Sequence, residues 1–141
     1  MKNKIHLIAL AILIIAASSC KKEDNSPAST TSSSISGIIT SGNWRVSYYH
    51  EGSNDHTSNF NGYTFAFSSS GTMTATDTSG MTSGTWRIDD SNVNEFHMSI
   101  GSSTPLTDLD RGWLITSQTS TEIQMKDDSG SSNEELHFTK I

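Results

Sequence analysis

The chain has 141 residues and carries 9 Lys and Arg against 15 Asp and Glu, a formal net charge of −6 at neutral pH. This acidic balance disfavours nucleic acid as a partner, because binding to phosphates depends on clustered cations. It also disfavours docking on an anionic membrane surface by charge alone. A single cysteine excludes an internal disulfide, so the core alone must stabilise the fold.

Residues 1–19 have the layout of a lipoprotein signal peptide. A short basic start precedes an apolar stretch from Leu7 to Ala17, and about 11 residues suit a signal-peptide core but not a membrane span of about 20. Two small residues then lead to Cys20, so we predict that its thiol is acylated and becomes the mature N-terminus. Acyl chains give stable membrane attachment at about 0.8 kcal/mol per buried methylene. The alternative is an ordinary cleavable signal with a coincidental cysteine.

The residues after Cys20 resemble the start of lipoproteins from Bacteroidetes-type bacteria. Lys22, Glu23 and Asp24 are similar to a lysine-plus-two-acids signal that sends some of these proteins to the outer cell surface. The resemblance implies an outer-membrane lipoprotein exposed on the cell surface, with the periplasmic face still open. A solvated charged spacer is the alternative reading of these three residues.

Residues 20–36 are predicted to be a tether. The stretch from residue 25 is rich in Ser and Thr, and it cannot bury enough apolar surface to become ordered. A flexible segment of this length spans roughly 20–25 Å on average. Cleavage before Cys20 would leave 7 basic and 15 acidic residues, a formal charge of −8.

Residues 37–141 are predicted to form one all-β domain. Apolar and polar residues alternate, and turn residues recur roughly every 10 residues, as is typical of a sandwich or barrel. The predicted strands cover residues 43–50, 61–68, 72–77, 84–89, 93–100, 112–118, 122–126 and 134–140, with a loop at 78–83 and a short helical turn within 101–111 that covers one barrel end. Eight sequential strands favour an antiparallel up-and-down barrel, because closure removes exposed strand edges.

The alternation also predicts which side chains face inward. Structurally, this set is a packed core; functionally, part of it would line a cavity for a small apolar ligand, since an eight-stranded barrel can do either. The predicted inward side chains are Trp44, Val46, Tyr48, Phe65, Phe67, Met73, Trp86, Ile88, Phe96, Met98, Trp113, Ile115, Met125, Leu136 and Phe138. The predicted ligand contacts among them are Trp44, Tyr48, Phe65, Trp86, Trp113 and Phe138.

The order of aromatic motifs resembles that of small lipocalin-like domains in Bacteroidetes lipoproteins. In those domains a Trp strand, a Phe-x-Phe strand, a Gly-x-Trp strand and a later Trp strand follow one another. Here they correspond to Gly42-Asn43-Trp44, Phe65-Ala66-Phe67, Gly84-Thr85-Trp86 and Leu109-Asp110-Arg111-Gly112-Trp113. The resemblance covers residues 42–141 and implies a lipocalin-like barrel.

Three groups of side chains are candidates for metal binding. His50, Glu51, Asp55 and His56 could hold an ion such as zinc, although their spacing matches no established motif and a solvated loop is the alternative. The runs Asp89-Asp90 and Asp127–Gly130 hold carboxylates that calcium would need, but hairpin turns use the same residues.

The remaining candidates give no sign of catalysis. His97 and His137 alternate with inward aromatic residues and are predicted to face outward. The sequence contains no nucleophile elbow, phosphate loop or paired-acid spacing, so we expect no catalytic residue and no cofactor.

Three functional hypotheses remain open from the sequence. The first is a lipid-anchored, non-enzymatic binding module for a small hydrophobic ligand. The alternative is a protein-interaction or hydrolase-inhibitor lipoprotein with a filled barrel, and an enzyme is the third. We expect a monomer with no nucleic-acid partner.

Overall fold

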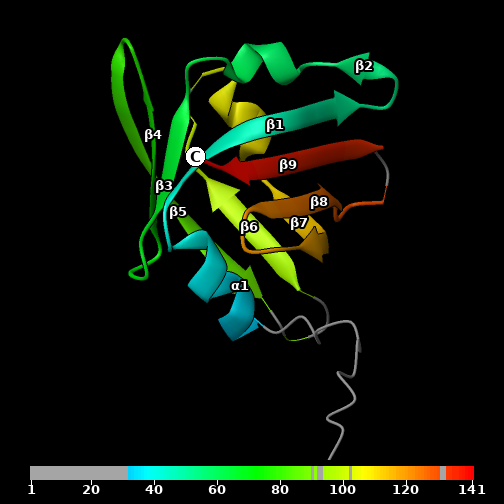
Figure 1. Ribbon diagram of the computed structural model, residues 1–141. Helices are drawn as coiled ribbons and strands as arrows, with labels where there is room; N and C mark the ends of the chain where they lie inside the picture. Colours follow the sequence, from blue (N-terminus) through cyan, green and yellow to red (C-terminus); the bar gives the residue numbers. More distant parts are fainter. Residues whose placement is uncertain (1–31, 90, 92–93, 102, 131–132) are drawn as a thin grey trace, which may run out of the picture.

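The computed structural model describes residues 32–89, 91, 94–101, 103–130 and 133–141 (Figure 1). The predicted signal peptide, Cys20 and the predicted export signal Lys22, Glu23 and Asp24 lie outside the described residues. In the described part of the chain, no helix is long and apolar enough to cross a membrane.

The domain is a closed antiparallel barrel of eight strands with one short additional strand (Figure 1). Each barrel strand pairs with the next along the chain, and the first pairs with the last to close the barrel. The predicted fold class, an all-β eight-stranded antiparallel up-and-down barrel, is confirmed. The strands are β1 (Asn43–Glu51), β2 (Asn54–Asp55, paired with the end of β1), β3 (Thr64–Phe67), β4 (Thr72–Asp77), β5 (Gly80–Asp89), β6 (Glu95–Ser99), β7 (Gly112–Gln118), β8 (Glu122–Asp127) and β9 (Glu134–Lys140).

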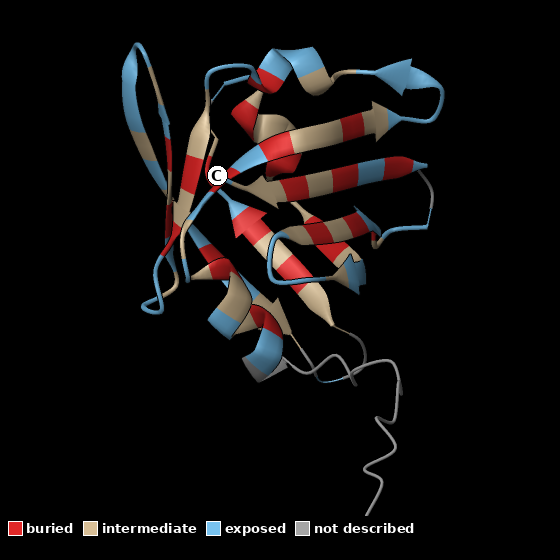
Figure 2. Ribbon diagram, viewed as in Figure 1, coloured by how far each residue is buried: buried red, intermediate tan, exposed pale blue. Residues whose placement is uncertain are grey.

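The predicted inward alternation accounts for most of the core. Figure 2 shows buried and more accessible residues alternating along the strands, as expected when successive side chains point to opposite faces. Ile88 and Ile115 are half-buried and pack against the core. The predicted inward residues that are buried are Trp44, Val46, Phe65, Phe67, Met73, Trp86, Phe96, Met98, Trp113, Met125, Leu136 and Phe138.

Tyr48 was wrongly predicted to face inward. The pairing of β1 with β9 shifts register between Val46 and Tyr48, and the extra residue of such a bulge reverses which side chains face the core. Tyr49 is therefore the fully buried tyrosine. The Tyr48 side chain lies on the outer face of the barrel and stacks on His50 and His137, with ring centroids 4.0 and 4.6 Å away.

The predicted loop at residues 78–83 is also wrong, because β4 and β5 form a long hairpin. Their pairing continues to Asp77 opposite Gly80, which leaves a two-residue turn. The Asp77 carboxylate accepts hydrogen bonds from the backbone N–H of Ser79 and Gly80, at 2.8 and 3.1 Å. This hairpin projects beyond the rest of the barrel (Figure 1).

A helix, α1 (Ser32–Ile39), contradicts the predicted tether over residues 32–36. Ile35 and Ile39 are four residues apart and therefore share one face of the helix. Both side chains are fully buried in the barrel core. The residues around Ile35 are polar, so the sequence pattern did not indicate this short apolar face. The folded domain includes residues 32–36.

Two short 3₁₀ helices, η1 (Thr57–Phe60) and η2 (Leu106–Leu109), supply further core residues. Phe60 of η1 packs edge-on against Tyr49, with ring centroids 5.4 Å apart. Both leucines of η2 are buried, and η2 confirms the helical turn predicted within 101–111. Figure 1 shows α1 and η1 at opposite ends of the barrel, so side chains from outside the strands fill the core from both ends.

Candidate functional site on the outer face of the barrel

The predicted ligand contacts are mostly packed against one another inside the barrel. Trp44, Phe65, Trp113 and Phe138 are fully buried, and the rings of Phe65 and Phe138 meet edge-on at a centroid distance of 5.3 Å. Trp86 is also buried, with 7% of its surface exposed. All five side chains therefore belong to the packed core.

The indole N–H groups of the buried tryptophans already have partners. Trp44 Nε1 donates to the Ile39 carbonyl at 2.7 Å, and Trp113 Nε1 donates to the Leu109 carbonyl at 3.2 Å. Trp86 Nε1 donates to a loop carbonyl at 2.9 Å. These tryptophans therefore fix the neighbouring chain segments onto the barrel.

The metal candidates at the end of β1 form two separate pairs. His50 Nε2 lies 3.4 Å from an Asp55 carboxylate oxygen, and His56 Nε2 lies 3.6 Å from an oxygen of Glu51. Glu51 also accepts a hydrogen bond from the hydroxyl of Tyr49 at 3.1 Å. Burial is the main reason why the pKa of the Tyr49 hydroxyl is raised well above its ordinary value, and the hydrogen bond to Glu51 raises it further.

Asp55 is also engaged within its own turn. Hydrogen bonds from Thr57 hold the pKa of the Asp55 carboxyl below its ordinary value, and the Thr57 backbone N–H lies 2.9 Å from Asp55 Oδ1. Among the described residues, the four candidates are not brought together as one set of ligands.

The acidic turn after β8 is used structurally. Asp127 is buried and accepts hydrogen bonds from the backbone and hydroxyl of Ser129. This is the turn role expected of an aspartate that bonds two residues ahead. Asp90, from the other acidic run, lies outside the described residues.

A polar ladder on the outer face of β5 and β6 was not anticipated from the sequence as a site. Inward residues such as Trp86 and Phe96 alternate with outward polar residues on both strands, and that alternation is the signal that could have found it. Because the strands are antiparallel and in register, the polar residues meet as cross-strand pairs. The pairs are Thr85 with Ser99, Arg87 with His97, and Asp89 with Glu95.

A groove of about 350 Å³ runs beside this ladder. Gly112 of β7 lies opposite His97, and the Asp128 carboxylate occupies the place that a side chain at Gly112 would take. A Cβ at Gly112 would collide with the carboxylate of Asp128 and approach His97 Cε1 to 3.1 Å. Residues lining the groove are Thr85, Trp86, Arg87, His97, Met98, Ser99, Arg111 and Gly112.

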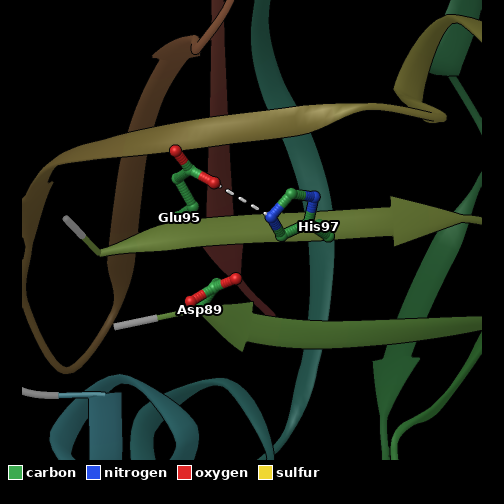
Figure 3. A group of neighbouring side chains, drawn as sticks. All are labelled: Asp89, Glu95 and His97. Atoms are coloured by element: carbon green, nitrogen blue, oxygen red, sulfur yellow. Dashed lines mark hydrogen bonds and ion pairs between the residues drawn. The ribbon is translucent and has the colours of Figure 1, made fainter. Parts of the chain in front are cut away.

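Asp89, Glu95 and His97 form a cluster at one end of the ladder (Figure 3). One ligand atom from each lies within 4.8 Å of the others, and His97 Nε2 is 3.1 Å from Glu95 Oε2. An imidazole with two carboxylates is a donor set that zinc accepts. His97 faces outward as predicted, although its side chain is only 27% exposed.

The oxygens of Asp89 already have other partners. Ser91 donates to Oδ1 through its hydroxyl at 2.7 Å and its backbone N–H at 3.1 Å, and Arg87 lies 3.1 Å from Oδ2. The hydrogen bonds from Ser91 are the main cause that lowers the pKa of Asp89 to about 2, and the hydrogen bond from Arg87 adds to them. A cation here would have to displace or sit beside the Arg87 guanidinium, so the geometry favours a hydrogen-bonding surface over a metal centre.

The Leu109–Trp113 segment holds one side of the groove in place. Both oxygens of Asp110 face the backbone N–H of Gly101, at 3.1 and 3.2 Å, and Oδ1 also accepts from Ile100 N–H. The Arg111 guanidinium forms an ion pair with Glu134 and lies 5.6 Å from the Trp113 ring centroid. These contacts give the Leu109–Trp113 motif a structural role.

Comparison with known proteins supports the fold alone. No family model matches the chain, and no curated protein matches it. A crystal structure of a DUF4847 family protein from Bacteroides vulgatus is similar, with a TM-score of 0.55 and 14% sequence identity over 74% of this chain and 96% of that chain.

Proposed function

We propose that this protein is a lipid-anchored, non-enzymatic interaction module of the bacterial cell envelope. In this proposal the filled barrel is a rigid scaffold, and an envelope protein binds its outer face at the β5–β6 ladder. The observation that carries the proposal is the packing of the interior. The predicted ligand-lining aromatics Trp44, Phe65, Trp113 and Phe138 are fully buried against other side chains, while a groove opens on the outer face beside the polar ladder.

The chemistry of the β5–β6 ladder favours a partner with hydrogen-bonding groups. Hydroxyls, an imidazole and a guanidinium lie next to two carboxylates on adjacent rungs. A surface of this mixed charge suits the polar side chains of a protein partner, since electrostatic complementarity mainly provides specificity.

Site-specific photocrosslinking in intact cells tests the partner. A photoreactive residue at Thr85, which is exposed in the groove, should give a defined crosslinked species, and one at the exposed Thr121 should not. Ser99→Tyr, which places a bulky side chain in the groove, should abolish the species. Crosslinks that are equal at both positions, or that persist in Ser99→Tyr, would contradict the proposed site.

A lipophilic ligand panel tests the alternative use of the interior. We expect no change in tryptophan fluorescence, because the three indoles are already packed and hydrogen-bonded. A saturable shift with one ligand would instead support a small hydrophobic ligand inside the barrel.

The anchor requires its own test. We expect wild-type cells to incorporate labelled palmitate into the protein and to retain it in the outer membrane, accessible to protease on intact cells. Cys20→Ala should remove the label and release the protein. Labelling that persists in Cys20→Ala would refute the assignment of the lipidated residue, and protease resistance on intact cells would indicate the periplasmic face.

A further inference from the structure

The tip of the β4–β5 hairpin has an open strand edge. β5 pairs with β4 along Gly80–Thr85, but it pairs with β6 only from Thr85 onward. Among the described residues, the stretch from Gly80 to Ser83 therefore has a strand on one side only. An open edge presents unpaired backbone N–H and C=O groups that can pair with another strand.

The direction of these groups follows from one hydrogen bond. The Trp86 N–H donates to the Gly71 carbonyl, on the β4 side, at 2.9 Å. The backbone N–H and C=O groups of successive residues point to opposite sides of a strand. Gly80, Thr82 and Gly84 therefore also direct their N–H and C=O groups toward β4. Met81 and Ser83 direct theirs to the open side.

The edge lacks the features that usually protect such strands. Charged side chains, proline or a bulge normally block edge pairing, yet residues 78–86 contain neither a charge nor a proline. Met81 is 66% exposed, one of two large apolar side chains described as exposed. The hairpin projects away from the barrel (Figure 1), so a second strand could approach it.

We infer that this edge pairs with the same edge of a second copy of the chain. An antiparallel pairing about a two-fold axis at Met81 gives two hydrogen bonds between the Met81 backbones and brings both thioether side chains together. Ser83 then faces Ser79 of the other copy. The axis cannot lie much nearer the barrel, because a Cβ at Gly84 would lie 2.5 Å from Ile100 Cα and the chain is crowded there.

The charge of the chain determines where a second copy can approach. Two copies of a chain with net charge −6 repel each other over most of their surface. The β5 side of the hairpin, residues 78–86, carries no charge. Two copies can touch there, and a two-fold contact uses the same patch on both subunits. The contact is small, so the pair should be weak and favoured by the crowding of anchored copies, a point that rests on the proposed lipid anchor.

Cysteine crosslinking of the full chain in lipidating bacteria tests the pairing. Opposed Cα atoms in a hydrogen-bonded pair lie about 5.5 Å apart, within the usual disulfide range. Met81→Cys should therefore form a disulfide dimer under mild oxidation. Thr76→Cys is the matched control, because Thr76 pairs with Met81 from the β4 side and lies a strand further from the axis. It should stay monomeric, as should the wild type with its own Cys20.

A charge swap gives a second readout that does not depend on oxidation. Met81→Lys and Met81→Glu should each abolish self-association of differently tagged copies, because like charges meet on the axis. Mixing Met81→Lys copies with Met81→Glu copies should restore co-purification. Thr76→Lys should leave the self-association of differently tagged copies unchanged. Met81→Cys that stays monomeric, that crosslinks to another protein, or that crosslinks no better than Thr76→Cys would overturn the inference, as would dimers that persist in Met81→Lys.

Discussion

Helix α1 is expected to contribute directly to the stability of the barrel. Replacing Ile35 with Ala removes three carbons from a fully buried side chain, a loss of about 2.4 kcal/mol at about 0.8 kcal/mol per methylene. The cavity left behind raises the usual cost to about 2–5 kcal/mol. Alanine favours the helix by a few tenths of a kcal/mol, so we expect a net loss of about 2–4 kcal/mol.

The assay is thermal and urea unfolding followed by tryptophan fluorescence. For a domain of about 100 residues, 1 kcal/mol shifts Tm by about 4 °C, so Ile35→Ala should lower Tm by about 8–16 °C. Gly37→Ala is the control within the same helix. A Cβ there meets nothing within 4 Å, and the substitution should raise stability by about 0.5–1 kcal/mol. If residues 32–36 were a free tether, neither change would matter, and an Ile35→Ala variant within 0.5 kcal/mol of wild type would refute the reasoning.

Two further predictions concern carboxylates that hold the outer groove. Asp110→Ala leaves two backbone N–H groups without their charged acceptor, and it should cost about 2–3 kcal/mol in urea unfolding; a loss below 0.5 kcal/mol would contradict the contact. Asp89, with its pKa held at about 2, should titrate below the ordinary value of about 3.9 in an NMR pH series, and Ser91→Ala should raise its pKa. Because the folded-state pKa is lowered, the stabilisation is present above pH of about 3.9 and is lost as the pH falls toward 2.

The sequence by itself determined the barrel and most of its core. Period-two alternation places Phe65 and Phe67 on one face wherever the strand is regular, so the eight strands and most of their inward residues could be predicted from local pattern alone. The same alternation places His97 outside. These properties depend on neighbours in the chain, which is why they can be read from it.

The tertiary structure decided the features that depend on distant partners. The bulge against β9 exchanges Tyr48 for Tyr49 in the core, and no residue near Tyr48 signals it. Ile35 orders α1 only because the open end of a barrel formed by later strands offers it a place to be buried.

The candidate site has the same origin. Glu95 and Asp89 belong to separate strands, and only the register between β5 and β6 brings them onto one rung. Gly112, which lines the groove beside them, belongs to β7, one strand further. Local alternation indicates which residues face outward, but the cross-strand register is set by the packing of the whole barrel. The pattern along one strand therefore does not show which outward residues meet.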